Sequence, residues 1–166
     1  MHTMLISVES LRTYFYTWAG VVKAVDGISF QLDERETLGL VGESGSGKTV
    51  TALSIMRVVP RPGKILDGKI MFKGVDLLEV PEQTMMGIRG GEIGYIFQDP
   101  STSLNPVFNI ASQLTEVISR HQDVSKKEAL ERATELMKLV EIPDADNRLW
   151  NLPHQLSGGM KQRIAV

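Results

Sequence analysis

The chain has 166 residues, of which 42% are hydrophobic and 23% charged, the balance of one ordinary globular domain with a packed core. Its net charge of −2 gives no electrostatic reason to expect a general nucleic-acid binder, and the absence of cysteine excludes disulfides and thiolate metal sites. No apolar run approaches the about 18 residues that span a bilayer, so we expect any role at a membrane to depend on a partner.

The first hundred residues are typical of short strands separated by turns. Alternating apolar residues predict strands over residues 5–8, 24–32, 69–72 and 93–97. Residues 37–42 form a continuous apolar run that ends in glycine, which predicts a strand buried on both faces. A helix is expected to follow over residues 48–57.

The chain changes character near residue 100 and then reads as helical. Proline is favoured at the first position of a helix, so Asn105-Pro106 predicts a helix start. The apolar stripe of that helix would consist of Val107, Ile110, Leu114, Val117 and Ile118. Ser125 and Glu128 match a capping box and predict a second amphipathic helix. A last helix is expected to begin near Ser157.

The sharpest motif is GESGSGKT, which matches G-x-x-x-x-G-K-[ST] between an expected strand and an expected helix. Its glycines let the backbone curl so that N–H groups and the helix N-terminus can hold phosphates. Lys48 would reach the β- and γ-phosphates, and Thr49 would offer its hydroxyl to Mg²⁺. The residues expected to bind the nucleotide here are Gly42, Glu43, Ser44, Gly45, Ser46, Gly47, Lys48, Thr49 and Val50. The alternative is a Gly/Ser-rich surface turn, but the fixed positions occur by chance in about one of a few hundred chains.

A second motif, LSGGMKQR, spans residues 156–163. By itself, Ser-Gly-Gly before a helix is only a favourable helix start. The order GESGSGKT, IFQDPSTSLNP, LSGGMKQR, however, resembles the nucleotide-binding subunits of ABC transporters along essentially the whole chain. VVKAVDGISF, FQDPSTSLNP and LPHQLSGGMKQR further resemble the oligopeptide/dipeptide importer subfamily, chiefly through Asp99–Pro106. Leu152 departs from that pattern, in which an aromatic residue is expected.

The resemblance implies an α/β fold of the P-loop NTPase (ABC ATPase) type, here incomplete. Residues 1–100 would form a β-rich nucleotide-binding core, residues 101–156 an α-helical subdomain, and residues 157–166 the start of the signature helix.

The resemblance also assigns further site residues. Phe15 stands where the family stacks an aromatic ring on adenine, although Tyr14 or Tyr16 could be the stacking ring, or Phe15 could merely pack. Gln98 matches the glutamine of the family's Q-loop, which reaches Mg²⁺ or the attacking water, so Lys48 and Gln98 are the catalytic candidates. Ser157, Gly158 and Gly159 would close over the γ-phosphate of ATP held by a facing subunit.

Two lone histidines, His121 and His154, are interpreted as structural or solvated rather than catalytic. His121 is expected to end a helix, where a partial positive charge suits the helix dipole.

The function implied is an ATP-binding, energy-coupling subunit of an importer, most simply for oligopeptides or dipeptides, with nickel or another small solute second. Its cofactors would be ATP and Mg²⁺. Its partners would be a second nucleotide-binding subunit, identical or paralogous, two transmembrane permease subunits and, indirectly, an external solute-binding protein, but no nucleic acid. It would lie peripherally on the cytoplasmic face of the cell membrane.

The family's catalytic glutamate and switch histidine follow the signature helix and have no counterpart in these 166 residues. We therefore expect the chain alone to hydrolyse ATP slowly or not at all, and turnover like that of an intact transporter ATPase would contradict this. Three alternatives stay open: a non-hydrolysing remnant that binds nucleotide, a soluble ABC-type ATPase of DNA maintenance, and a translation-associated twin-cassette protein. The second usually has a long coiled coil, for which no heptads appear here. The third needs a second cassette.

Overall fold

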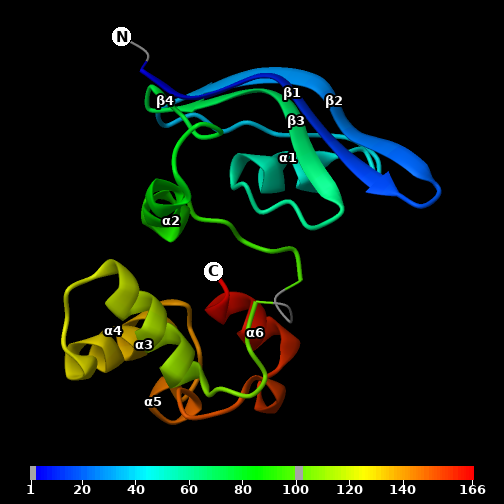
Figure 1. Cartoon of the computed structure of the whole chain (residues 1–166). Coiled ribbons are helices and arrows are strands. Elements are labelled where there is room, and N and C mark those ends of the chain that lie inside the picture. The colour runs from blue at the N-terminus through cyan, green and yellow to red at the C-terminus, as the bar shows by residue number, and fades with distance from the viewer. Residues whose placement is uncertain (1–2, 100–102) are drawn as a thin grey trace. The chain divides into compact units, whose positions relative to one another are not determined.

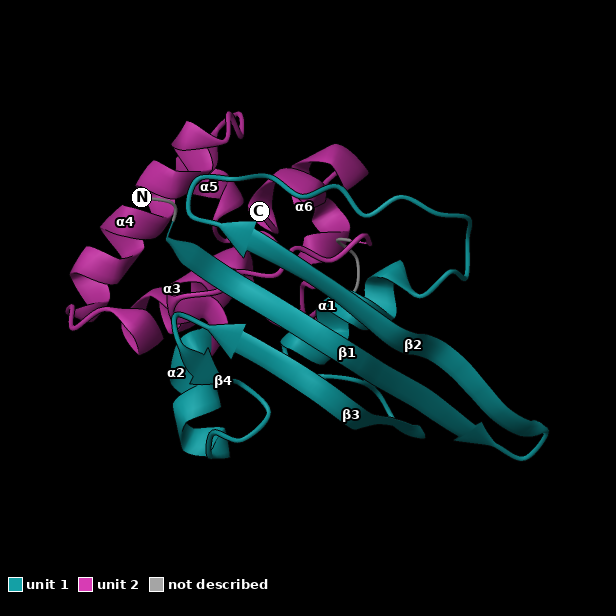
Figure 2. Ribbon diagram, turned by 90° about the horizontal axis from the view of Figure 1, so that it is seen from above, with its two compact units in different colours: residues 1–88 teal, residues 89–166 magenta. Residues whose placement is uncertain are grey.

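The computed structural model describes residues 3–99 and 103–166. The chain forms two compact units, residues 1–88 and 89–166, which Figure 2 colours separately. In the described part of the chain, no helix combines the length and the apolar character needed to cross a lipid bilayer.

Unit 1 is built on a four-stranded antiparallel sheet with the order β2-β1-β3-β4 (Figure 1). The strands are β1 (Met4–Thr17), β2 (Gly20–Asp33), β3 (Gly63–Phe72) and β4 (Val75–Asp76). The strands predicted over residues 5–8, 24–32 and 69–72 are confirmed. β1 is paired on both sides, so it is a central strand and not an edge.

Helix α1 (Lys48–Ile55) lies against one face of this sheet (Figures 1 and 2) and confirms the predicted helix. Two contacts fix it there. A Cβ added to Gly47, the residue before the helix, would collide with the backbone carbonyl of Ala24 in β2. Farther along the helix, the Ser54 hydroxyl lies 2.8 Å from the Thr13 hydroxyl of β1, and both side chains are fully buried. The helix is therefore held to two neighbouring strands.

Two predicted strands are wrong. Residues 37–42 are exposed and form no strand, and Val41 is 98% exposed. Residues 93–97 also form no strand, apart from one bridge between Arg89 and Ile93. A strand requires a neighbour that takes up its backbone N–H and C=O groups, and no described strand pairs with either segment. Apolar character alone did not make them strands.

A helix that the sequence patterns did not predict, α2 (Glu82–Gly91), is interrupted at Arg89 and Gly90, where the φ of Gly90 is +80°. Unit 1 ends at residue 88, just before this interruption.

Unit 2 is helical, with α3 (Ile110–His121), α4 (Lys126–Leu139), α5 (Ala145–Arg148), a 3-10 turn (Pro153–Gln155) and α6 (Gly158–Ile164). Its core gathers apolar side chains from α3, α4, α5 and α6 and from the segments beside them: Leu104, Ile110, Ala111, Ile118, Ala129, Ala133, Met137, Ile142, Ala145, Leu149, Leu156 and Met160. The capping box of α4 is confirmed, with Ser125 and Glu128 bonding each other's backbone N–H groups. The helix predicted from Ser157 is confirmed as α6.

The predicted start of α3 at Asn105-Pro106 is wrong, because α3 begins at Ile110 with Asn109 as its N-cap. The Asn105 side chain accepts the Val107 N–H, and the Gln113 side chain bonds both backbone groups of Asn105. These bonds hold the segment as a turn. The predicted stripe is correspondingly only partly buried: Ile110 and Ile118 are buried and Leu114 half-buried, while Val107 and Val117 are exposed.

The contact of Gly47 with β2 gives a testable prediction about stability. Gly45 and Gly47 both have φ near +90°, but a Cβ at Gly45 meets no atom within 4 Å. Gly45→Ala should therefore cost only the backbone strain of about 1–2 kcal/mol. Gly47→Ala adds the collision with Ala24 and should cost more than about 3 kcal/mol. Urea denaturation measures both, and equal losses would contradict the close approach.

The capping box of α4 predicts a pH dependence. The Ser125 hydroxyl and backbone N–H hold the pKa of the Glu128 carboxyl below its usual value. A carboxyl with a lowered pKa in the folded state stabilises the fold above its unfolded pKa and loses this contribution as the pH falls. Glu128→Gln keeps an acceptor that does not titrate. The stability difference between the wild type and Glu128→Gln should therefore shrink between about pH 6 and about pH 3 in urea denaturation. A constant difference would contradict this role of the carboxylate.

Candidate functional site

The loop before α1 is tightly wound. The φ angles of Gly45 and Gly47 are +83° and +91°, in the left-handed region that glycine adopts without strain. A Cβ at Gly42 would lie 2.5 Å from the Ser46 Oγ, so the loop closes on itself at that point. The Ser46 N–H donates to the Glu43 carbonyl at 3.2 Å. Residues 41–46 are exposed, so the outer side of the loop is open to a ligand.

Lys48 is the first residue of α1, and its side chain folds back over this loop. Its Nζ donates to the carbonyl oxygens of Gly42 at 2.6 Å and Glu43 at 2.7 Å, and it lies 3.2 Å from the Ser46 Oγ. The ammonium is thus held beside the N-terminus of α1. Both carry positive charge, which favours an anion at this place.

The first turn of α1 is tied to the loop by Thr51. Its backbone N–H and its hydroxyl both donate to the Gly47 carbonyl, at 2.8 and 3.0 Å. Gly47 in turn lies on Ala24 of the sheet. The Thr49 side chain remains exposed in the same turn. The loop therefore offers a lysine ammonium, N–H groups and a free threonine hydroxyl from a rigid base, a donor set that fits a phosphate chain with a divalent cation.

Phe15 lies near the end of β1 on the face of the sheet that carries α1. It shares that face with Thr13, which contacts α1, because alternate residues of a strand point the same way. The half-buried ring covers Gly63 of β3, where a Cβ would come within 2.7 Å of the Phe15 Cε1.

The other two aromatic candidates belong to the opposite face. The Tyr14 hydroxyl donates to Asp26, which lowers the pKa of that carboxyl, and Lys23 lies 5.4 Å above the Tyr14 ring. Lys64 lies 5.8 Å above the Tyr16 ring. Of the three rings, only that of Phe15 is on the side of the phosphate-loop helix.

The remaining predicted residues lie in unit 2. Gln98 is exposed in an irregular segment, and the neighbouring motif residues Pro100, Ser101 and Thr102 lie outside the described residues. The Ser157 hydroxyl caps α6 by accepting the Met160 N–H at 3.3 Å. Gly158 and Gly159 are exposed, and a Cβ at either would meet no atom within 4 Å. Packing within unit 2 does not require these two glycines.

His121 and His154 both lie in unit 2. His121 ends α3, and its imidazole lies against Gly90, where a Cβ would come within 2.9 Å of its Nε2. His154 is exposed in the 3-10 turn. Among the described residues, no group of three or more His, Asp or Glu side chains is arranged to hold a metal.

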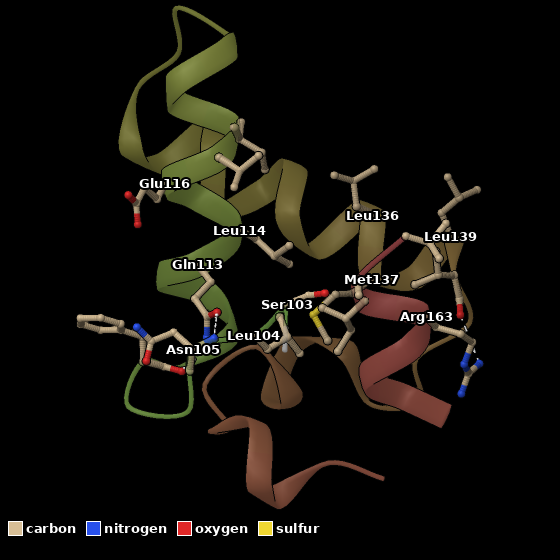
Figure 3. A pocket seen from close by; sticks show the side chains of 17 residues that line it. Ser103, Leu104, Asn105, Gln113, Leu114, Glu116, Leu136, Met137, Leu139 and Arg163 are labelled. Atoms are coloured by element: carbon tan, nitrogen blue, oxygen red, sulfur yellow. Dashed lines mark hydrogen bonds between the residues drawn. The ribbon is translucent and has the colours of Figure 1, made fainter. Parts of the chain in front are cut away.

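A cavity of about 930 Å³ opens in unit 2 between α3, α4 and α6 (Figure 3). Its lining is mainly apolar, and none of the predicted site residues contributes to it. The Arg163 guanidinium at its rim donates to the carbonyls of Val140 and Glu141, at 3.1 and 2.6 Å. This cation thereby caps the C-terminal end of α4.

Sequence patterns missed the buried hydroxyls of Thr13, Thr51 and Ser54. Polar residues on the inward face of α1 were the available signal, but their partners lie on another element and are visible only in the fold.

Comparison with known proteins assigns the chain to a family. The ABC transporter family model matches residues 25–166. The oligopeptide transport ATP-binding protein OppD of Bacillus subtilis is 48% identical over 99% of this chain and 46% of its own length. The dipeptide transport ATP-binding protein DppD of the same organism is 47% identical over 98% of this chain and 49% of its own. The chain thus spans about half the length of these curated relatives.

Among solved structures, the fold is similar to that of the ATP-binding cassette MJ0796 in a dimeric, post-hydrolysis state bound to ADP and Pi. The TM-score is 0.83 at 22% identity, over 97% of this chain and 67% of that one. This likeness confirms the predicted ABC ATPase fold class. The match of the family model to residues 25–166 shows that the chain belongs to the ABC transporter family.

Proposed function

We propose that this chain is the ATP-binding part of the energy-coupling subunit of an ABC importer for oligopeptides or dipeptides. The observation that carries the proposal is the Gly42–Thr49 loop, in which the Lys48 ammonium lies over exposed backbone at the start of α1. Family membership and the transport names of the relatives at 47–48% identity support it.

In this proposal the loop binds the phosphates of ATP. Backbone N–H groups and the α1 N-terminus hold the phosphate chain, and Lys48 exchanges its carbonyl partners for the β- and γ-phosphates. Thr49 and Gln98 would hold Mg²⁺, which neutralises developing charge on the phosphates. Phe15 would stack on adenine, which its place on the α1 face supports.

In unit 2, Gln98 would reach Mg²⁺ or the attacking water. The signature residues would act between subunits, because Ser157, Gly158 and Gly159 would close over ATP held by a facing subunit. The open space around both glycines supports this, since an external group can approach the helix start closely. We further propose that residues 1–100 form the nucleotide-binding core, residues 101–156 the helical subdomain and residues 157–166 the start of the signature helix.

The wider assembly is part of the proposal. Two nucleotide-binding subunits would lie beneath two permease subunits on the cytoplasmic face of the membrane, and an external solute-binding protein would deliver peptide. ATP binding and hydrolysis by the whole protein would drive transport. The relatives named for oligopeptide and dipeptide transport support peptide as the cargo.

Removing the Lys48 ammonium tests the phosphate site. Lys48→Ala should lower the affinities for Mg-ATP and Mg-tripolyphosphate alike by at least about tenfold, because charge-assisted hydrogen bonds to phosphate are lost. Isothermal titration calorimetry measures both affinities. Lys126→Ala, which removes an exposed lysine on α4, is the control and should change neither affinity. Undiminished binding by Lys48→Ala would refute the site.

Removing the Phe15 ring tests the adenine site separately. Phe15→Ala should lower the affinity for Mg-ATP about five- to 100-fold and leave the affinity for Mg-tripolyphosphate unchanged, because only ATP has a base that can stack on the ring. Tyr16→Ala removes a ring from the opposite face and should spare both ligands. If Tyr16→Ala or Tyr14→Ala instead weakens ATP selectively, the stacking residue is misassigned.

A further inference from the structure

A pair of buried hydroxyls joins the strand of Phe15 to the helix of the phosphate loop. Thr13 in β1 and Ser54 in α1 are each 0% exposed, and their hydroxyl oxygens lie 2.8 Å apart. Val25, the β2 residue that pairs with Thr13, is buried as well. A buried polar pair in such a place is directional, whereas apolar contacts alone let elements slide.

The direction of this hydrogen-bond chain follows from the number of protons. The Ser54 hydroxyl donates to the Val50 carbonyl at 2.7 Å, which uses its one proton. Thr13 must therefore donate to Ser54. The chain runs from β1, through Ser54, to a carbonyl in the first turn of α1, two residues after Lys48.

The two ends of this chain lie next to the two halves of the candidate ATP site. Thr13 is two residues before Phe15 on the same face of β1, and Val50 directly follows the GESGSGKT loop. Gly47 gives α1 a second fixed point on Ala24 of β2. Two separate points on two strands restrict both the sliding and the rotation of α1 against the sheet.

We propose that Thr13 and Ser54 are positioning residues that fix the spacing between the Phe15 ring and the phosphate loop. A nucleotide that spans both halves needs that spacing, whereas a bare triphosphate needs only the loop. The pair would thus set the preference of the chain for ATP over triphosphate. This inference rests on the proposed function, because it takes the loop and Phe15 as the binding site.

The test compares Mg-ATP and Mg-tripolyphosphate affinities of the full 166-residue chain by calorimetry. Thr13→Val keeps the shape and removes the hydroxyl. Thr13→Val with Ser54→Ala removes both partners, so that no buried hydroxyl oxygen is left without its donor. Both variants should lower the affinity for Mg-ATP roughly three- to tenfold, because part of the stacking contribution of Phe15 is lost. The affinity for Mg-tripolyphosphate should stay within about twofold of the wild-type value. Thr13→Ser, which retains a hydroxyl, should restore the preference for ATP.

Two controls separate positioning from general loss of stability. Ser7→Ala removes another buried hydroxyl of β1, six residues before Thr13, and should leave the ratio of the two affinities unchanged. In a Phe15→Ala background, Thr13→Val should cost no further ATP affinity, because Thr13 acts through that ring. Thermal melting of each variant establishes that it is folded.

The outcomes distinguish this inference from the proposed function. The inference would be overturned if Thr13→Val and the double variant left the ratio of the two affinities unchanged, including the case in which both affinities fall equally. The loop would still be the phosphate site after such a result. A wild-type chain that binds neither ligand would overturn both. Additive losses from Thr13→Val and Phe15→Ala would also refute a positioning role.

Discussion

The contact between Gly47 and the Ala24 carbonyl is the constraint on which the candidate site depends. It brings the backbone of the loop so close to β2 that no side chain fits between them. The Gly47 carbonyl then receives two hydrogen bonds from Thr51, which start α1 at a defined place. Because α1 starts there, Lys48 can fold back onto the carbonyls of Gly42 and Glu43. Loop shape, helix position and lysine placement therefore follow from one steric contact.

The packing of α1 on the sheet also bears on the two parts of the proposed nucleotide site, the phosphate loop and the Phe15 ring. Phosphate recognition needs only local elements, namely curled backbone, a helix N-terminus and one ammonium. Recognition of a base needs a second element at a fixed distance, and in the proposed site that element is Phe15 of β1. The buried pair of Thr13 and Ser54 joins that strand to α1. In unit 2, the exposed Gly158 and Gly159 have no packing role of their own, in keeping with a surface that meets a partner.

The sequence predicted the features that depend on interactions between residues close together in the chain. The capping box at Ser125, the α1 helix and the phosphate-loop motif were readable because their interactions lie within a few residues. Residues 37–42 and 93–97 were mispredicted because a strand depends on a neighbour distant in sequence. The start of α3 was missed because Gln113 reaches back eight residues to bond Asn105. The Thr13–Ser54 pair, 41 residues apart, could not be read from any window.

Backbone amide chemical shifts of the ¹⁵N-labelled chain, recorded as Mg-ATP is added, test the central claim most directly. The account predicts that the largest shifts fall on the amides of residues 43–50, with the Phe15 ring protons shifting as well. Tripolyphosphate should reproduce the amide shifts without those of the ring. Shifts that leave residues 43–50 unchanged and gather elsewhere, for example around the apolar cavity of unit 2, would contradict the assignment of the nucleotide site.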